Sequence, residues 1–195
     1  MQKAIFFDRD GVIIDDVHLL TKISQVKISN KVIDAFTMLK EMNYLLIVVS
    51  NQTVIARGIS TYDEVDIIHD FINDVLINKT SSRIEKFYYC PHHPEATVEK
   101  YKTNCMCRKP KSGMLYDAAK EFSIDLNHSW MIGDRISDII AGHNAGCKTI
   151  NLLTGAHNAK PIISDAMDLS KTPDYKCSNL LEAINIIHQL DQNSK

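Results

Sequence analysis

Short apolar runs alternate with amphipathic stretches along this chain. The apolar runs are bounded by polar or turn-forming residues, as expected for buried strands, and the stretches between them repeat apolar residues at helical spacing. The predicted strands cover residues 3–7, 45–49, 86–89, 130–132, 149–152 and 175–177. The predicted helices cover about residues 30–42, 62–77, 114–122, 136–145 and 180–190. This alternation predicts an α/β fold in which a Rossmann-like parallel sheet carries helices on both faces.

The length of the chain favours one domain. At 195 residues it can bury one substantial core, but it is short for a core and a large cap domain. We therefore expect residues 1–190 to form a single α/β domain, with the polar segment 90–107 as a loop insertion. The first helix can be capped by Ser29 or Asn30, and its apolar spacing continues to Met42.

Composition and charge narrow the possible partners. The chain is 45% hydrophobic and 24% charged, and its formal net charge of −2 lacks the basic excess typical of nucleic-acid-binding proteins. It shows neither a secretory signal pattern nor a transmembrane run. We therefore expect a cytoplasmic monomer whose partner is a small molecule, with no nucleic acid and no membrane. An anionic ligand would have to be bound by local positive charge.

Polar residues follow three of the predicted strands. They form the pairs Asp8/Asp10, Ser50/Asn51 and Asp134/Asp138. In an open parallel sheet, ligands bind beyond the carboxyl ends of the strands, near the point where the strand order reverses. The sequence therefore predicts that one site contains all three pairs.

The acidic residues of this predicted site suggest a divalent cation. In extended geometry Asp8 and Asp10 would face the same side of the chain and Arg9 the other, while Gly11 would allow close backbone approach. Neighbouring carboxylates repel unless a cation lies between them, and Asp134 would complete an oxygen-rich Mg²⁺ site. The alternative is a capped turn with solvated acids, because short motifs often match by chance. On these residues alone both interpretations remain open.

Cysteine and histidine gather in the polar segment. Cys90 and His92 are separated by twelve residues from Cys105 and Cys107, a spacing from which a loop can close a tetrahedral Zn²⁺ site. Four protein ligands leave no open coordination position, so such a zinc would be structural. His93 is the competing fourth ligand. A disulfide or redox site is the less favoured alternative, because cytoplasmic thiols stay reduced and redox pairs are typically C-x-x-C.

The order of these motifs resembles that of the haloacid dehalogenase (HAD) superfamily. The resemblance rests on D-R-D-G-V at 8–12, Ser50 after the second strand, Lys109 in a later loop and G-D-R-I-S-D at 133–138. It implies a phosphatase. Asp8 would be the nucleophile that forms an aspartyl-phosphate, and Asp10 would act as acid and then as base.

The same resemblance implies roles for the remaining motif residues. Ser50 would donate a hydrogen bond to the phosphoryl group, and Lys109 would bring positive charge to the transition state. The catalytic Mg²⁺ would be held by the Asp8 and Asp134 carboxylates and the Asp10 carbonyl. Asp138 would lie behind these ligands.

Two further motifs resemble one bacterial group within the superfamily. They are C-P-H-H-P with C-M-C-R-K-P, within residues 90–110, and N-Q-T-V-I-A-R-G at 51–58. The group contains heptose 1,7-bisphosphate phosphatases and histidinol-phosphate phosphatases. The twelve-residue gap in the cysteine loop is similar to the gap in the heptose enzymes. The resemblance therefore implies removal of the 7-phosphate of a phosphorylated heptose, in the biosynthesis of lipopolysaccharide or another surface glycan. Histidinol phosphate or another sugar phosphate remains the alternative.

Substrate contacts are also implied by this resemblance. The residues carried over are Asp16, Asn51, Gln52, Arg108 and Arg135, and Arg108 would bind a substrate phosphate through its fork of donors. The chain departs from the group at residues 14–20 and at Thr53-Val54, where Ser-Gly is more usual. These segments concern substrate recognition, so the identity and anomer of the sugar stay open while hydrolysis is still expected.

Overall fold

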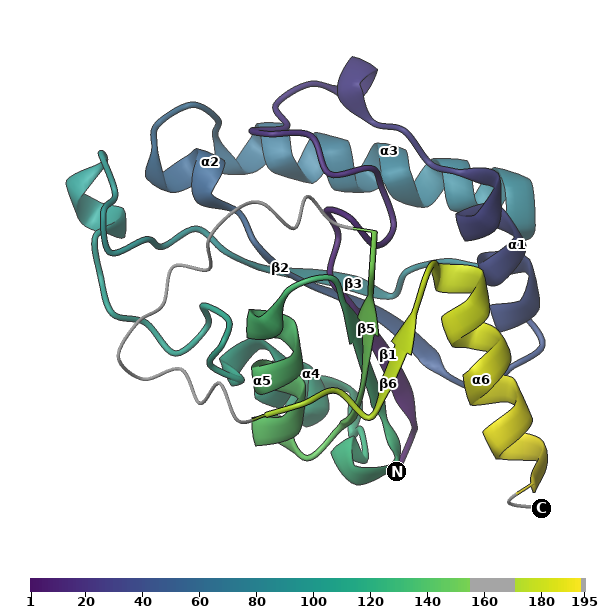
Figure 1. Ribbon diagram of the computed structural model, residues 1–195. Coiled ribbons are helices and arrows are strands. Elements are labelled where there is room, and N and C mark those ends of the chain that lie inside the picture. The colour runs from purple at the N-terminus through teal and green to yellow at the C-terminus, as the bar shows by residue number, and fades with distance from the viewer. Residues whose placement is uncertain (155–170, 194–195) are drawn as a thin grey trace.

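A parallel six-stranded sheet forms the centre of the part of the chain that the structure describes, residues 1–154 and 171–193 (Figure 1). The structure is a computed structural model. The strands are β1 (Ala4–Phe7), β2 (Leu45–Asn51), β3 (Lys86–Cys90), β4 (Trp130–Gly133), β5 (Lys148–Leu152) and β6 (Tyr175–Cys177). They are arranged in the order β3-β2-β1-β4-β5-β6, and every pair is parallel. The predicted fold class is confirmed.

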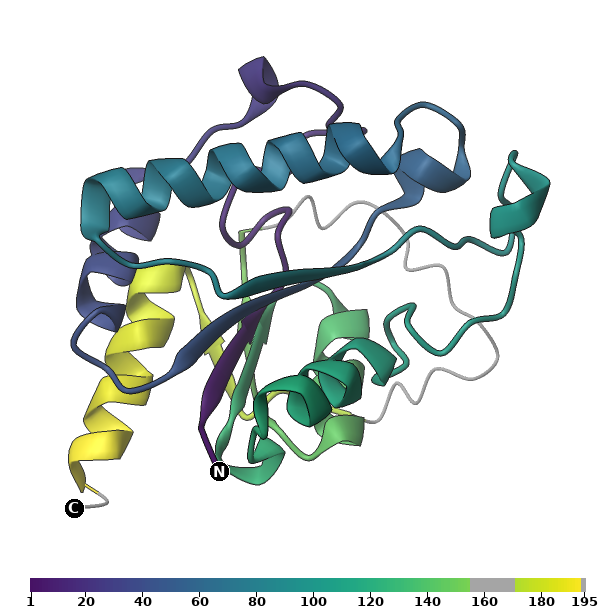
Figure 2. The same cartoon turned by 180° about the vertical axis from the view of Figure 1, so that it is seen from behind.

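Helices cover both faces of the sheet. They are α1 (Asn30–Leu39), α2 (Thr53–Ala56), α3 (Tyr62–Thr80), α4 (Gly113–Phe122), α5 (Ile136–Ala145) and α6 (Leu180–Asn193). Short 3₁₀ turns occur at Ile23–Gln25, Glu99–Tyr101 and Leu126–His128. Figures 1 and 2 show α1, α3 and α6 on one side of the twisted sheet and α4 and α5 on the other.

The two faces of the sheet have separate apolar cores. In β1, Ile5 and Phe7 pack with α1, α3 and α6, whereas Ala4 and Phe6 pack with α4 and α5. This follows from the alternation of side chains along a strand. Because both faces are covered, consecutive strand residues are apolar, which is the pattern that identified the strands.

The first helix ends earlier than its apolar spacing predicts. Of the two predicted caps, Ser29 is the one used, because its hydroxyl accepts a hydrogen bond from the backbone N–H of Val32 at 3.4 Å. The helix stops at Leu39, and Met42 lies in the following turn. Met42 is nevertheless buried against the same core. Its apolar side chain therefore indicates a buried position and not a helical backbone.

At their carboxyl ends, β2 and β3 extend further than predicted, and the extension matters for the site. β2 continues through Ser50 and Asn51, and β3 through Cys90. Ser50 pairs with Tyr89 in the parallel ladder, and Asn51 pairs with Cys90. Polar side chains do not interrupt backbone pairing, so these residues are carried on the rigid sheet rather than on a loop.

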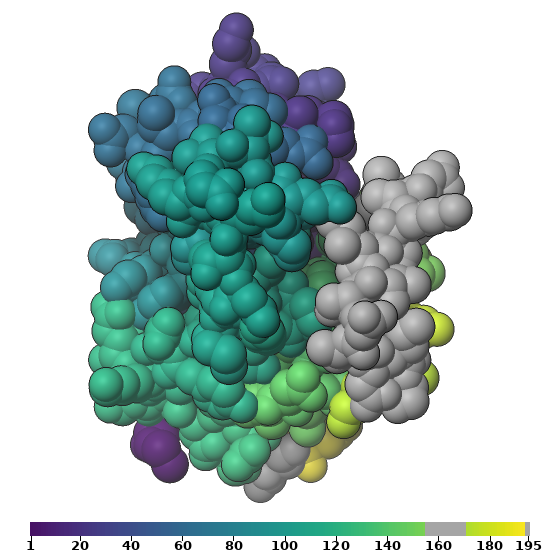
Figure 3. Space-filling model, turned by 90° about the vertical axis from the view of Figure 1, so that its left-hand side faces the viewer, coloured from purple at the N-terminus to yellow at the C-terminus, as the bar shows by residue number. Residues whose placement is uncertain are grey.

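The cysteine-containing segment stands on one edge of the molecule. Figure 3 looks onto that edge and shows the teal surface of this segment between blue surface above it and green surface below it. Within residues 1–154 and 171–193, none of the helices combines the length and apolar character needed to cross a membrane.

Candidate active site

The predicted acidic residues meet at the centre of the sheet. β1 pairs with β2 on one side and with β4 on the other, so the strand order reverses beside it. Asp8 follows β1, and Asp134 follows β4. Together with Asp138, in the first turn of α5, they bring carboxylate oxygens within 4.8 Å of one another. All three side chains are buried.

Lys109 is the positive charge of this acidic group. Its ammonium is buried, lies 3.0 Å from Asp8 Oδ1 and 2.7 Å from Asp138 Oδ1, and donates to the carbonyl of Val49 at 2.7 Å. Burial alone would lower the pKa of Lys109, but the charges of Asp138 and Asp8 outweigh burial and raise it. Lys109 therefore remains protonated, and it contacts the predicted nucleophile directly.

Asn51 holds Lys109 in place. Its amide donates to the Lys109 carbonyl and accepts from the Lys109 backbone N–H, both at 3.0 Å. These two bonds join the end of β2 to the loop that carries Lys109. We predicted Asn51 as a substrate contact; the structure adds this contact to the lysine, a role that spacing along the chain did not suggest.

The buried carboxylates fit a divalent cation. Asp134 Oδ1 is buried and has no hydrogen-bond partner within the described residues. Burial, followed by the charges of Asp8 and Asp138, raises the pKa of Asp134 to about 8. Three carboxylates beside one ammonium leave an excess of negative charge that a hard cation such as Mg²⁺ would neutralise, and oxygen donors are the ligands it prefers.

Glycine at position 11 is required by this geometry. A Cβ at Gly11 would lie 2.5 Å from Asp134 Oδ2, and its φ of +82° is in the left-handed region that disfavours other residues. The Gly11 backbone therefore passes directly against the acid that ends β4. This contact confirms the expected close approach of the backbone.

Asp138 is engaged on both of its oxygens. Oδ1 lies against Lys109, and Oδ2 accepts the backbone N–H of Arg135 at 3.0 Å. Burial is the largest of the effects that raise the pKa of Asp138 to about 6. With both oxygens occupied by protein groups, the geometry agrees with a place behind the metal ligands.

The backbone turns at Arg9, so the expected alternation of Asp8, Arg9 and Asp10 does not hold. The Arg9 carbonyl accepts the N–H groups of Ile13 and Ile14, at 3.0 and 3.1 Å. The Arg9 side chain is 1% exposed rather than facing away. It contacts the Asp10 carboxylate through Nη2, at 2.9 and 3.0 Å, and through Nε at 3.2 Å. The expectation that Arg9 faces the side opposite to Asp10 was therefore wrong.

Gln52 connects Asp10 to Ser50. Its Nε2 donates to Ser50 Oγ at 2.7 Å and to Asp10 Oδ2 at 3.1 Å. Both Ser50 and Gln52 are buried. The polar residues at the end of β2 are thus linked to the residues after β1, as expected if one site contains the three polar pairs.

The remaining predicted substrate contacts lie closer to solvent. The half-exposed Arg135 donates from Nη2 to Asp16 Oδ2 at 3.0 Å. Arg108 donates from Nη1 to the carbonyl of His92 at 2.9 Å, which joins the arginine to the cysteine loop. Burial lowers the pKa of Arg108. Burial also acts to lower the pKa of Arg135, but the charges of acidic neighbours led by Asp134 outweigh it and raise that pKa. Their roles toward a substrate stay predictions.

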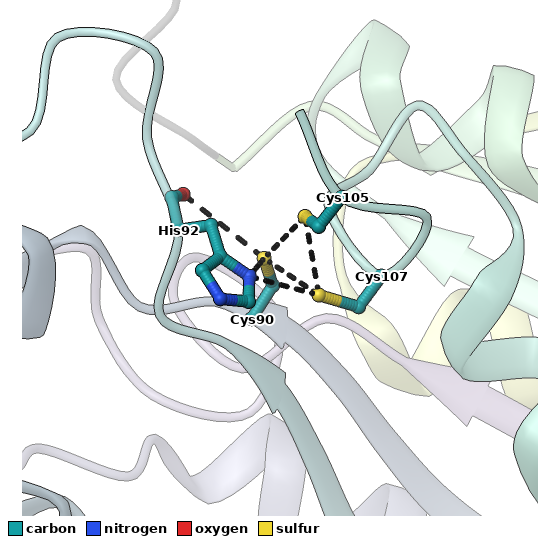
Figure 4. A group of neighbouring side chains, drawn as sticks. All are labelled: Cys90, His92, Cys105 and Cys107. Atoms are coloured by element: carbon teal, nitrogen blue, oxygen red, sulfur yellow. Dashed lines mark hydrogen bonds between the residues drawn. The ribbon is translucent and has the colours of Figure 1, made fainter. Parts of the chain in front are cut away.

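The four predicted zinc ligands converge (Figure 4). The Sγ atom of Cys107 lies 3.0 Å from that of Cys90, 3.2 Å from that of Cys105 and 3.4 Å from His92 Nδ1. Three sulfurs and one imidazole nitrogen are the kinds of donor that a closed tetrahedral zinc site uses, and this group could hold a metal ion. His93 is outside the group, because its Nδ1 accepts the backbone N–H of Glu95 at 3.0 Å.

One further residue near the site was missed from the sequence. His69 lies on α3 among the buried apolar positions Val65, Ile68 and Ile72, and its Nε2 is 3.2 Å from Arg9 Nη1. The sequence signal that could have identified His69 was a histidine at a core-facing position of an amphipathic helix. Periodicity alone indicates only that the side chain at such a position is packed in the core.

Comparisons with known proteins agree with this geometry. A family model described as HAD-hydrolase-like matches residues 106–183. The chain is 38% identical over 190 residues to the D-glycero-beta-D-manno-heptose-1,7-bisphosphate 7-phosphatase of Haemophilus influenzae, covering 97% of this chain and 99% of that protein. It is 36% identical over 155 residues to the D-glycero-alpha-D-manno-heptose-1,7-bisphosphate 7-phosphatase of Photorhabdus laumondii, covering 80% and 84%.

A solved structure is similar over almost the whole chain. It is the crystal structure of D,D-heptose 1,7-bisphosphate phosphatase from B. bronchiseptica complexed with magnesium and phosphate. The two chains share 26% identity with a TM-score of 0.78, covering 96% of this chain and 99% of the other. The magnesium in that structure agrees with the cation-binding character of the acidic group.

Proposed function

Because this chain belongs to the haloacid dehalogenase-like phosphatases, we propose that it hydrolyses the 7-phosphate of a D-glycero-D-manno-heptose 1,7-bisphosphate. Family membership makes it a phosphoric monoester hydrolase. The observation that carries the proposal is the buried contact of Lys109 with Asp8, at 3.0 Å. The loop that carries Lys109 also carries Arg108. The names of relatives for both anomers support the heptose bisphosphate as substrate. The product would feed the biosynthesis of nucleotide-activated heptose for a surface glycan.

Asp8 is the proposed nucleophile. Its Oδ1 accepts the Arg9 backbone N–H at 2.8 Å and lies against Lys109. We therefore assign attack on phosphorus to Oδ2. In the first step an Asp8 oxygen–phosphorus bond forms while the bond from phosphorus to the sugar oxygen breaks. In the second step water attacks phosphorus, the bond to Asp8 breaks, and inorganic phosphate leaves.

Asp10 is the proposed acid and base for these steps. It protonates the departing sugar oxygen and later takes a proton from the attacking water. Four donor contacts from Arg9 and Gln52 reach its carboxylate and hold it in place. For the first step one of these contacts must open to admit the proton.

The phosphoryl group is held by positive charge and by donors around it. Mg²⁺ bound by the Asp8 and Asp134 carboxylates and the Asp10 carbonyl would neutralise charge on the phosphoryl oxygens. Lys109 supplies a second, fixed positive charge, and the Ser50 hydroxyl is placed to donate a hydrogen bond. Asn51, Gln52, Asp16, Arg108 and Arg135 complete the proposed contacts to the substrate.

The cysteine loop has a supporting role in this proposal. Zinc bound by Cys90, His92, Cys105 and Cys107 would join the two ends of the loop, directly before Arg108 and Lys109. The bond from Arg108 to the His92 carbonyl supports this role, because it ties the arginine to a proposed ligand. The metal would therefore position basic residues rather than react.

We also propose that residues 1–190 act as one domain, as a cytoplasmic monomer. The support for one domain is the packing of α6 in the same core as α1 and α3. Residues 155–170 of the proposed domain lie outside the described residues. Cytoplasmic location is supported by the reduced thiols that zinc binding requires.

The substrate assignment is tested by a panel of phosphate esters. Purified protein with Mg²⁺ is expected to release phosphate from heptose 1,7-bisphosphate at least about tenfold faster, by kcat/KM, than from histidinol phosphate, because a second phosphate can engage Arg108. Both anomers are assayed separately, and the product is checked for retention of the 1-phosphate. Preference for histidinol phosphate would contradict the proposal.

The zinc proposal predicts one metal ion per chain. Elemental analysis is expected to find about one zinc in the wild type and a loss of zinc in Cys107→Ser, because three ligands no longer close the site. We expect the variant to lose about 10²-fold in activity, since small displacements of positioning groups have effects of that size. Cys147→Ala, at a buried thiol outside the group, should retain zinc. A wild type that is fully active and stable without zinc would contradict the proposal.

A further inference from the structure

His69 is a buried imidazole for which the proposed mechanism has no use. It lies on the inner face of α3 and is 3% exposed. Its ring stacks on Phe87, with centroids 4.4 Å apart and 11° between the planes, and meets the edge of Tyr89 at 5.1 Å. Neighbours on two sides thus fix the orientation of the ring. A buried polar ring held in this way is expected to have a defined hydrogen-bond partner.

The partner of His69 is Arg9. Because a guanidinium can only donate, the 3.2 Å contact from Arg9 Nη1 requires His69 Nε2 to accept. The imidazole is therefore neutral, with its proton on Nδ1. Nδ1 is buried and has no hydrogen-bond partner within the described residues, because Asp66 Oδ1 is 3.9 Å away. Burial, and then the charge of Arg9, hold the pKa of His69 well below its ordinary value, in agreement with the neutral form.

The other side of the same guanidinium holds Asp10. Arg9 Nε and Nη2 contact the Asp10 oxygens while Nη1 contacts His69. The guanidinium is rigid and planar, so a constraint at Nη1 also constrains Nε and Nη2. Arg9 is 1% exposed, so water cannot readily replace a lost acceptor. Removing the acceptor would leave a buried N–H unpaired and would favour a different position of the whole group.

We infer that His69 is a positioning residue that, through Arg9, sets the position of the Asp10 carboxylate relative to the leaving oxygen. The inference rests on the proposed role of Asp10 as acid, and it does not depend on which sugar is the substrate. Within the described residues, the polar and ring contacts of His69 are with Arg9, Phe87, Tyr89 and Asp66, and none of these is a proposed metal ligand. Its effect on the reaction is transmitted by one hydrogen bond to the guanidinium.

The experiment compares two aryl phosphates that differ in leaving group. Protonation by an acid accelerates departure of a poor leaving group, phenol, more than departure of a good one, p-nitrophenol. Since kcat/KM includes formation of the aspartyl-phosphate, the ratio of kcat/KM for p-nitrophenyl phosphate to that for phenyl phosphate reports on Asp10. His69→Phe keeps the aromatic ring but removes the acceptor. It is expected to raise this ratio by about tenfold.

Matched variants separate positioning from packing. His69→Gln restores an acceptor and should return the ratio to within about twofold of the wild type. His69→Asn carries the same amide one methylene shorter and should behave like the phenylalanine variant. Ile68→Val changes buried packing at the preceding residue of α3 and should affect both substrates equally.

Each result decides the inference. Equal losses on both substrates in His69→Phe would overturn it, as would a glutamine variant that resembles phenylalanine. Should His69→Phe fail to fold, the glutamine and asparagine variants provide the same comparison, and a wild-type ratio in asparagine would overturn the inference. A wild type that hydrolyses neither these esters nor heptose bisphosphate would refute the phosphatase mechanism itself. Rejection of heptose bisphosphate with the aryl effect intact would refute only the substrate.

Discussion

Asp8→Asn is expected to lower kcat by at least about 10⁴-fold while the fold is retained. Asparagine has nearly the same shape as aspartate, but its neutral amide cannot form the aspartyl-phosphate and is a poorer ligand for Mg²⁺. Removing one charge from a buried acidic group also reduces repulsion with Asp134 and Asp138, so loss of fold is not expected. Phosphate release from heptose 1,7-bisphosphate with Mg²⁺ measures the effect, and circular dichroism measures the fold.

A matched control is available for this substitution. Asp34 is exposed on α1, and Asp34→Asn makes the same chemical change away from the site. Its activity should remain within about twofold of the wild type. Turnover by Asp8→Asn at even a hundredth of the wild-type rate, with mass spectrometry confirming that the amide is intact, would remove Asp8 as the nucleophile.

Lys109→Met is expected to reduce both stability and activity. The substitution keeps most of the side-chain volume but leaves Asp8 and Asp138 buried without their counter-charge, which costs about 3–5 kcal/mol for buried ion pairs. It also removes fixed positive charge from the transition state, and we expect kcat to fall by about 10²- to 10³-fold. Urea unfolding without Mg²⁺ measures the stability. Steady-state kinetics at saturating Mg²⁺ measures the activity.

The two effects of Lys109→Met can be separated. Mg²⁺ should recover part of the lost stability, because a bound cation neutralises the same carboxylates, but it should not restore kcat. Lys40→Met, at the exposed end of α1, removes a lysine without a buried partner and should change the free energy of unfolding by no more than about 0.5 kcal/mol. A Lys109 variant with wild-type kcat would contradict the role assigned to its ammonium.

The order of strands and helices could be predicted because both faces of the sheet are covered. Residues such as Phe6 and Phe7 face different cores, so a buried strand becomes a continuous apolar run that is visible in the sequence. The ends of elements were less predictable. Met42 lies outside α1 although it is buried, and Asn51 belongs to β2 although it is polar, because periodicity reports burial and not backbone hydrogen bonding.

The candidate site was predictable in its residue types. Asp8 and Asp134 follow strands that a parallel sheet brings together, and their carboxylates meet as expected. The zinc ligands were predictable for a similar reason, since Cys90 lies at the end of β3 and its partners lie a short loop away. Residue type and strand order together determine which groups share an edge of the sheet.

The sequence by itself determined that acidic residues gather at the carboxyl ends of a parallel sheet and that a cysteine loop stands beside a basic pair. Only the tertiary structure decided which groups touch. The Arg9–His69 contact joins residues 60 apart, and the Asn51–Lys109 contact joins residues 58 apart. Such pairs depend on how α3 and the cysteine loop pack against the sheet, and composition and periodicity carry no information about that packing. The sequence therefore indicated the chemistry, and the fold decided how Asp10 and Lys109 are held for it.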